Sequence, residues 1–313
     1  MPLTLIPAGT KFDFLRVRTI ALAASLLVLL ISVFSFLHKG LEYGIDFRGG
    51  ILLEIRTQGP ADLAHLRSTL SGLNLGGVEL QEFGQPDNIL VRVERQKGDE
   101  KAQQAAVEVI KKSLDQNIEY RRVEFVGPKV GQELIRTGVL ATMLAIGAIM
   151  IYIWFRFEWQ FGVSGIVALL HDVVTTIGLF SLFQIEFNLT SVAAILTIAG
   201  YSINDTVVVF DRVRENLRKY KAMPLLKLLN LTVNETLSRT ILTSSTTLIA
   251  VLMLFFFGGE VIHGFSLAMI WGIVIGTYSS IWVASALLIY FGVKRTAVVR
   301  DESPAGAAAA PGE

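Results

Sequence analysis

Six long apolar runs constrain this chain more than any other feature of its sequence. They lie at 20–37, 135–155, 162–183, 189–210, 240–258 and 264–291. A helix needs about 20 mostly apolar residues to cross the hydrocarbon core of a bilayer. A hydrophobic share of 52% over 313 residues agrees with several such spans. We therefore expect a polytopic membrane protein with six transmembrane helices.

The first run differs from a cleaved signal peptide. Arg16 and Arg18 precede it, but the run 20–37 is longer than the usual apolar region of about 7–15 residues. No A-x-A cleavage pattern follows the run before His38. We expect this run to be retained as the first transmembrane helix, behind an N-terminal segment at 1–19.

Lysine and arginine are concentrated in every second connection between these spans, and hence on one side of the membrane. They occur in 1–19, in the turn 155–161, throughout 211–239 and in the tail 293–313, whereas the short loops 184–188 and 258–263 have none. Short loops rich in these residues stay on the cytoplasmic side of a membrane. Both termini are therefore expected in the cytoplasm, residues 38–133 outside, and the other five spans as one block over 134–292.

Two of the cytoplasmic segments have a recognisable composition. Within the expected loop 211–239, leucines alternate with polar residues from Met223 to Leu237, and Pro224 suits a first helical turn. This pattern predicts either an amphipathic helix on the membrane surface or a connector with a core-packing face. The tail 293–313 is rich in Pro, Gly and Ala and is expected to be disordered.

The polar region 38–133 has the pattern of a small α/β domain. Strands are expected at 51–57, 78–83, 89–93 and 118–126, and helices at 60–73 and 100–114. The order βαββαβ is that of a ferredoxin-like domain. No nucleophile, base and orienting group recur at a useful spacing, so we expect a contact or lever module and no enzyme.

Glycines mark both connections between this domain and the spans. Gly49 and Gly50 follow the first span, and Gly127, Pro128 and Gly131 precede the second. Such residues permit tight backbone turns. They are candidates for shaped hinges, with ordinary turns as the alternative.

Composition excludes several kinds of function. The chain has no cysteine, and its four histidines match no metal-binding spacing. Thiolate zinc sites, cysteine nucleophiles and disulfides are excluded, and we expect neither a metal nor another cofactor. The formal net charge of +1 gives no basic field for nucleic acid.

Polar residues interrupt the fourth apolar run. Asp205 lies well inside it, and Tyr201, Ser202 and Asn204 lie next to it in the sequence. A charged side chain at a helix centre costs roughly 2.5–3.5 kcal/mol on insertion scales, and such residues often mark ion pathways. Asp205 is therefore a candidate proton-binding group. The alternative is a structural carboxylate that is paired with an arginine.

Two further polar groups lie in the third and fifth runs. His171 and Asp172 are adjacent, and this pair suits either proton relay or helix association. Arg239 is followed on one helix face by Thr243 and Thr247, although a long side chain at a helix end can also extend to the membrane surface.

These groups together suggest a switch. Protonation of Asp205 would remove its charge and weaken its hold on Arg239, so that the helices could shift.

Several stretches of the chain resemble the SecF family, the smaller half of the SecD–SecF accessory complex of bacterial protein export. They are Gly44-Ile45-Asp46-Phe47-Arg48-Gly49-Gly50, Val126-Gly127-Pro128-Lys129-Val130-Gly131, Leu170-His171-Asp172-Val173, the segment 199–212 around Asn204-Asp205, and Ser238-Arg239-Thr240. The resemblance covers nearly the whole chain, in order.

The resemblance implies a fold similar to the resistance-nodulation-division transporters and a place in the bacterial inner membrane. It implies pairing with SecD, work with the SecYEG channel and the YajC and YidC proteins, contact with the exported polypeptide and with membrane lipid, and protons as the coupling ion. The matching residues Asp205 and Arg239 are implied in proton passage. Because Met1 opens a basic N-terminal segment, SecD is expected to be a separate polypeptide.

Three other functions are alternatives for such a chain. A proton-coupled solute exporter of the same superfamily usually has two large external loops in a longer chain. An intramembrane aspartyl protease would use two membrane aspartates, but neither Asp172 nor Asp205 follows the G-x-G-D pattern. A structural scaffold for SecD would tolerate neutralisation of Asp205 and Arg239.

Overall fold

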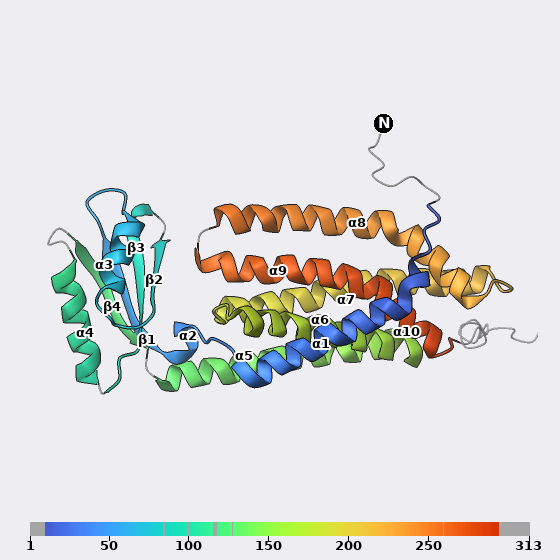
Figure 1. Ribbon diagram of the computed structural model, residues 1–313, viewed down its shortest axis with the longest axis horizontal. Coiled ribbons are helices and arrows are strands. Elements are labelled where there is room, and N and C mark those ends of the chain that lie inside the picture. The colour runs from blue at the N-terminus through green and yellow to red at the C-terminus, as the bar shows by residue number, and fades with distance from the viewer. Residues whose placement is uncertain are drawn as a thin grey trace, which may run out of the picture.

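The structure is a computed structural model that describes residues 10–83, 85–98, 100–114, 118–126, 128–258 and 260–293. A block of long helices carries a small sheet domain at one end (Figure 1). Among these described residues, six helical stretches are long and apolar enough to cross a membrane: Phe14–Lys39, Gly131–Arg156, Trp159–Phe183, Leu189–Lys219, Leu225–Phe257 and Ile262–Tyr290. The protein is thus a polytopic helical membrane protein, as its apolar runs predict.

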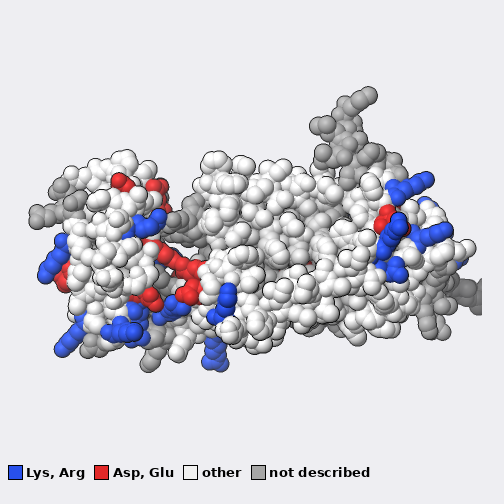
Figure 2. Space-filling model, in the orientation of Figure 1, with Lys and Arg blue, Asp and Glu red and all other residues white. Residues whose placement is uncertain are grey.

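The helical block consists of long α-helices joined by short connections. Its elements are η1 (Phe14–Val17), α1 (Arg18–Lys39), α5 (Pro128–Arg156), α6 (Trp159–Phe183), α7 (Leu189–Lys219), α8 (Leu225–Phe257), α9 (Glu260–Ser279), a π-helical turn η2 (Ser280–Ala284) and α10 (Ser285–Tyr290). The N-terminal η1 and the C-terminal α10 lie at the end opposite the sheet domain (Figure 1). On the face shown in Figure 2, charged side chains gather at the two ends, and the helices between them carry almost none.

The segment 211–239 differs from the expected loop. α7 continues to Lys219 and α8 begins at Leu225, so only 220–224 lie outside helices. Leu228 and Leu229 are fully buried in a core cluster that includes residues of α7 and α10. The segment is therefore helical and not a loop, because burial of the leucine face makes 225–239 the first part of α8. The place of this part on the cytoplasmic membrane surface stays a prediction. The alternative of a core-packing face agrees with the structure.

The sheet domain has the expected ferredoxin-like topology. It comprises β1 (Gly50–Arg56), α3 (Leu63–Ser71), β2 (Val78–Phe83), β3 (Gln85–Glu94), α4 (Glu100–Ser113) and β4 (Glu119–Val126). The strand order is β2-β3-β1-β4, with every neighbouring pair antiparallel. Alternate residues of the central strand β1, namely Ile51, Leu53 and Ile55, are fully buried in one core with Leu70 and Ile110.

A short helix α2 (Ile45–Arg48) joins α1 to this domain. Gly49 has φ of 77°, a conformation that glycine adopts without strain, and β1 begins at Gly50. A Cβ atom on Gly131 would clash with the carbonyl group of Phe47, so α5 passes directly against α2. Of the other two hinge candidates, Pro128 begins α5 and Gly127 lies outside the described residues. At Gly131 the connection is closely packed.

Gly131→Ala is expected to destabilise this joint. The added methyl would have to displace the backbone of α2, and overpacking of this kind costs about 1–3 kcal/mol. Limited proteolysis measures this effect, and cleavage between the sheet domain and α5 should be faster in the variant. Gly147→Ala in the same helix is the matched control, because nothing lies within 4 Å of its added Cβ. Equal proteolysis of the two variants would contradict the close packing.

Candidate functional site

Asp172 of α6 joins three helices inside the block. Its Oδ2 atom accepts hydrogen bonds from Ser202 Oγ of α7 at 2.5 Å and from Ser279 Oγ of α9 at 2.6 Å. The His171 Nδ1 atom lies 2.8 Å from its other oxygen. Asp172 is fully buried and His171 is 2% exposed. The carboxylate therefore has a partner on each oxygen, as a buried polar group requires.

Asp205 of α7 is held in a similar way, but by different helices. Its Oδ1 atom accepts a hydrogen bond from Thr240 Oγ1 of α8, and its Oδ2 atom accepts one from Ser280 Oγ, both at 2.6 Å. Its exposed fraction is 9%. Both described partners are neutral hydroxyl groups, which can donate or accept.

Two consecutive serines thus connect the two aspartates. Ser279 ends α9 and contacts Asp172, whereas Ser280 begins the π-helical turn and contacts Asp205. Ser285, the first residue after that turn, donates from its Oγ atom to the carbonyl oxygen of Ser280 at 2.9 Å, five residues earlier. Single π-helical turns inside α-helices are frequent at functional sites. Here the turn begins at Ser280, the second of the two serines that bond the aspartates of α6 and α7.

Small residues let α7 and α9 approach each other beside the site. A Cβ atom on Gly276 would lie 3.2 Å from Cβ of Ser202, and one on Gly272 would clash with the side chain of Ile198. Glycine at such crossings allows the close backbone approach that stabilises helix pairs in membranes. Both glycines therefore help to bring the serines of α9 within reach of the aspartates.

Two supporting residues named from the sequence do join hydrogen-bond networks. Ser202 contacts Asp172, and Tyr201 donates from its hydroxyl to Ser244 Oγ at 3.2 Å. Ser244 in turn lies 2.7 Å from Thr277 Oγ1 of α9. The sequence reasoning gave no role to Thr240, Ser279 or Ser280. In the sequence these three are small hydroxyl residues within otherwise apolar runs. This is weak evidence for a functional role, because such residues commonly form hydrogen bonds within their own helix.

Other expected members of the site lie apart from the aspartates. The side chain of Arg239 is exposed, and among the described residues it makes no ion pair with Asp205. Its neighbour Thr240 points at Asp205, and adjacent residues on a helix point about 100° apart, so the arginine faces away. The expected Asp205–Arg239 contact is therefore not present. Asn204 is also exposed.

The two threonines expected to follow Arg239 on one face bond within their own helix. Thr243 Oγ1 donates to the carbonyl oxygen of Arg239 at 3.0 Å, and Thr247 Oγ1 donates to that of Thr243 at 2.9 Å. Neither hydroxyl is used by a carboxylate. Among the residues described, no group of three His, Asp or Glu side chains is placed to hold a metal ion.

α7 also connects the site to the sheet-domain junction. The Asp46 Oδ2 atom of α2 accepts a hydrogen bond from the backbone nitrogen of Leu189, the first residue of α7, at 3.1 Å. A negative charge there is stabilised by the helix dipole. Gly44 N donates to the carbonyl oxygen of Phe187 at 2.9 Å, in the loop just before α7. Asp205 follows about 24 Å along the same helix, at 1.5 Å per residue.

A cavity at this junction contains an unusual carboxyl group. It has a volume of about 220 Å³ and is lined by Glu79, Leu80, Ile185, Glu186, Asn188, His263 and Gly264. The pKa of Glu79 is raised from 4.5 to about 8, first by burial and then by a hydrogen bond with Glu186 and by the charge of that residue, against the opposing effect of Arg92. Asp46 acts in the same direction as Glu186. Glu79 of the sheet domain thus stays protonated up to a higher pH than an ordinary glutamate, next to Glu186 of the helical block.

Docking of the sheet domain is therefore expected to weaken as pH rises. The pKa of Glu79 is 4.5 when the sheet domain is separated from the helical block and about 8 when it is docked. At pH values between these two, docking is therefore coupled to the uptake of a proton by Glu79. The stabilisation is complete below about pH 4.5 and is lost as pH rises through about 8. Distances between spin labels on the domain and on α9 should lengthen over this range.

Glu79→Gln removes the titrating group and should abolish this pH dependence. Glu82→Gln is the matched control, because Glu82 lies on the same strand and is exposed. A Glu79→Gln variant that keeps the wild-type pH dependence would contradict the assignment.

Comparisons with known proteins agree with this architecture. The family described as "Protein export membrane protein SecD/SecF, C-terminal" matches residues 106–294, and the "SecD/SecF GG Motif" matches residues 34–61. The protein translocase subunit SecF of Cereibacter sphaeroides is 47% identical over 96% of this chain and 95% of that protein. The SecF subunit of Rickettsia bellii is 44% identical over 94% of this chain and 98% of that protein.

Solved structures show the same arrangement. A crystal structure of SecDF in a super-membrane-facing form has a TM-score of 0.74 and 36% sequence identity, over 96% of this chain. SecDF from Thermus thermophilus, titled a translocon-associated membrane protein, has a TM-score of 0.73 and 36% identity over 93% of this chain. This chain spans 41% and 39% of those longer proteins. With a family match over more than half its length and full-length relatives, the chain belongs to the SecD/SecF family of protein-export membrane proteins.

Proposed function

We propose that this chain is the SecF subunit of a bacterial protein-export complex, paired with SecD in the inner membrane with both termini in the cytoplasm. The relatives named protein translocase subunit SecF support this proposal, as does the likeness to SecDF, a longer chain of which this one matches about two fifths. A subunit of this kind is a transport component and no enzyme. SecYEG, with YajC and YidC, is its proposed site of action on the exported polypeptide.

The second part of the proposal is that Asp205 takes up and releases the coupling proton. The observation that carries it is the pair of hydroxyl partners, Thr240 and Ser280, on the two oxygens of this buried carboxyl. An ionised aspartate accepts from both hydroxyls. A protonated one donates to one of them, which only has to rotate. A partner arginine would instead hold the aspartate ionised.

Proton uptake would then alter how α7 is tied to α8 and α9. When Asp205 becomes neutral, both of its hydrogen bonds lose their charge assistance, and charge-assisted bonds are roughly twice as strong as neutral ones. The π-helical turn that begins at Ser280 is the element best placed to respond, because it already departs from α-helical spacing. α7 carries the change to Asp46 and the sheet domain.

Within this proposal Arg239 and His171 have supporting roles. Arg239 is exposed near the middle of α8, where it is available to SecD. His171 bonds Asp172, and its second ring nitrogen is buried without a hydrogen-bond partner among the described residues.

Complementation tests the proposed function as a whole. Cells depleted of their own SecD and SecF would receive this chain together with the SecD of the same genome. We expect SecD to co-purify with the chain and the maturation of signal-peptide-bearing precursors to recover. A chain that reaches the membrane and binds SecD without restoring export would contradict the proposal. Resistance to toxic solutes in place of export would favour the exporter alternative.

A further inference from the structure

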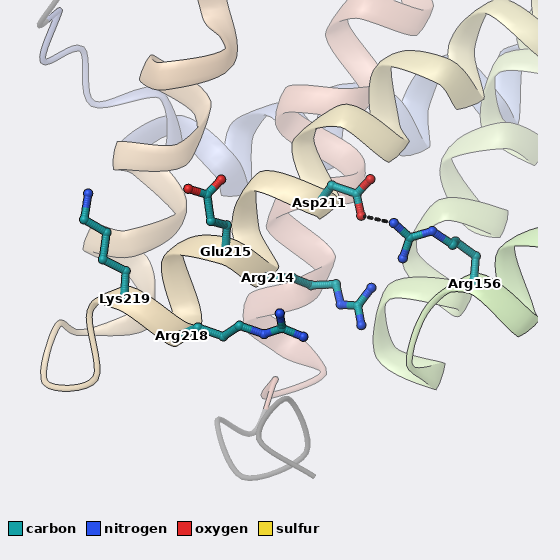
Figure 3. Close-up of a pocket in the computed structure, with 6 residues that line it drawn as sticks. All are labelled: Arg156, Asp211, Arg214, Glu215, Arg218 and Lys219. Carbon is teal, nitrogen blue, oxygen red and sulfur yellow. Dashed lines mark hydrogen bonds and ion pairs between the residues drawn. The ribbon is translucent and has the colours of Figure 1, made fainter. Parts of the chain in front are cut away.

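A basic cavity lies at the end of the helical block that is opposite the sheet domain. Its volume is about 460 Å³, and it is lined by Arg156, Asp211, Arg214, Glu215, Arg218 and Lys219 (Figure 3). Arg156 ends α5, and the other five residues follow one another along the last turns of α7. Four cationic and two anionic side chains leave this lining with a net charge of +2.

Both carboxylates of the lining form ion pairs with arginines. Asp211 Oδ1 lies 2.8 Å from Arg156 Nη2, and Glu215 Oε2 lies 2.6 Å from Nη1 of Arg212, which is not part of the lining. Figure 3 shows the guanidinium groups of Arg214 and Arg218 extending to the same side of α7 as Arg156. The cavity therefore presents an excess of positive charge to whatever enters it.

Arg214 provides a second observation that points to an anionic ligand. Its Nε atom is buried and has no hydrogen-bond partner among the described residues. Its guanidinium lies 5.7 Å from the ring centre of Phe157, and that of Arg156 lies 5.0 Å from the same ring. The aromatic ring thus fixes two guanidinium groups at the cavity wall, and such planar groups bind phosphate oxygens well.

The surroundings place this cavity at a membrane interface. Trp154, Phe155 and Trp159, which flank Arg156 in the sequence, are 54%, 86% and 53% exposed. Large aromatic residues at the ends of membrane helices lie at the level of lipid headgroups. An occupant that combines a phosphate with acyl chains would meet both the cationic wall and these rings.

We propose that this cavity binds the phosphate of an anionic phospholipid headgroup. Basic pockets between transmembrane helices on the cytoplasmic side are suited to such headgroups. Bound lipid would fasten the ends of α5 and α7 to one another through a shared anion, in addition to the Arg156–Asp211 ion pair. Free phosphate shares the same chemistry, so the test has to separate the two sources.

Binding can be measured on the purified full chain with its SecD partner in nanodiscs. The probe is phosphatidylglycerol in competition with phosphatidylcholine, and lipid retained by the protein is counted by native mass spectrometry. The double substitution Arg214→Gln with Arg218→Gln should reduce the preference for phosphatidylglycerol about 30-fold, from about 1 kcal/mol for each cation near the surface. Arg136→Gln with Lys39→Gln removes two cations at the other end of the block and should leave the preference unchanged.

Two further outcomes decide the source and guard against misfolding. Displacement of the lipid by millimolar inorganic phosphate would overturn the lipid assignment in favour of a free anion. A photoactivatable phosphatidylglycerol on the wild-type protein needs no variant, and it should crosslink to the segments 154–159 or 211–219. Crosslinks only elsewhere, or an unchanged lipid preference in the double variant, would also overturn the proposal.

Discussion

Asp205→Asn is expected to abolish the stimulation of export and to leave the helix packing intact. Asparagine has the same shape, its carbonyl oxygen still accepts one hydroxyl, and its amide group donates to the other, which rotates to accept. It cannot exchange a proton. The measurement is precursor maturation in cells that lack their own SecF, at matched membrane levels and with SecD still bound.

The adjacent residue provides a control for this experiment. Asn204 is exposed, one position before Asp205, so Asn204→Ala should retain normal export. Normal export by Asp205→Asn would show that this carboxyl is structural. Any proton path would then have to use SecD or another carboxyl such as Asp172, and the scaffold alternative would gain support.

Asp172→Ala is expected to have the largest effect on stability. It would remove the acceptor for His171, Ser202 and Ser279 at once, in a fully buried position. At about 1 kcal/mol for each lost hydrogen bond, the free energy of unfolding should fall by about 3 kcal/mol. Thermal unfolding in detergent and the steady-state amount in the membrane measure this loss.

A single-bond variant calibrates the effect. Ser279→Ala removes only one of the three donors to Asp172 and should cost about 1 kcal/mol. If Asp172→Ala unfolds at the temperature of the wild type, the carboxyl does not fasten α6 to α7 and α9. The two aspartates would then have to be assigned different roles from those proposed above.

The elements that could be predicted from the sequence are those fixed by local pattern. Apolar runs long enough to span a bilayer gave the helices, and alternation in segments such as Ile51–Ile55 gave the strands of the sheet domain, since one face of each is buried. Both signals repeat along the whole element, as apolar composition in the helices and as alternating burial in the strands. They are therefore strong even without knowledge of tertiary contacts.

The parts that were missed depend on contacts between elements. Lysines and arginines in 211–239 suggested a loop, but a buried leucine face and the buried Asn216 side chain, which donates to Thr232 at 3.0 Å, make the region helical. Arg239 was an obvious partner for an intramembrane carboxyl by charge. Only the rotation of α8 shows that Thr240 faces Asp205 instead.

The partner Ser280 was the hardest to anticipate. A straight α-helix would set the directions of Ser279 and Ser280 by position alone, and neither serine differs from the many that bond their own backbone. The π-helical turn from Ser280 to Ala284 and the close crossing at Gly276 determine which helix each serine reaches. Neither feature follows from local composition.

Infrared difference spectroscopy of the purified SecD-bound chain tests the central claim most directly, because it observes carboxyl protonation itself. Spectra recorded between acid and alkaline pH should contain a band of a protonated carboxyl in an apolar environment. The account predicts that Asp205→Asn removes this titrating band and that Asn204→Ala keeps it. A band that is unchanged in Asp205→Asn would contradict the assignment of Asp205 as the proton-binding group.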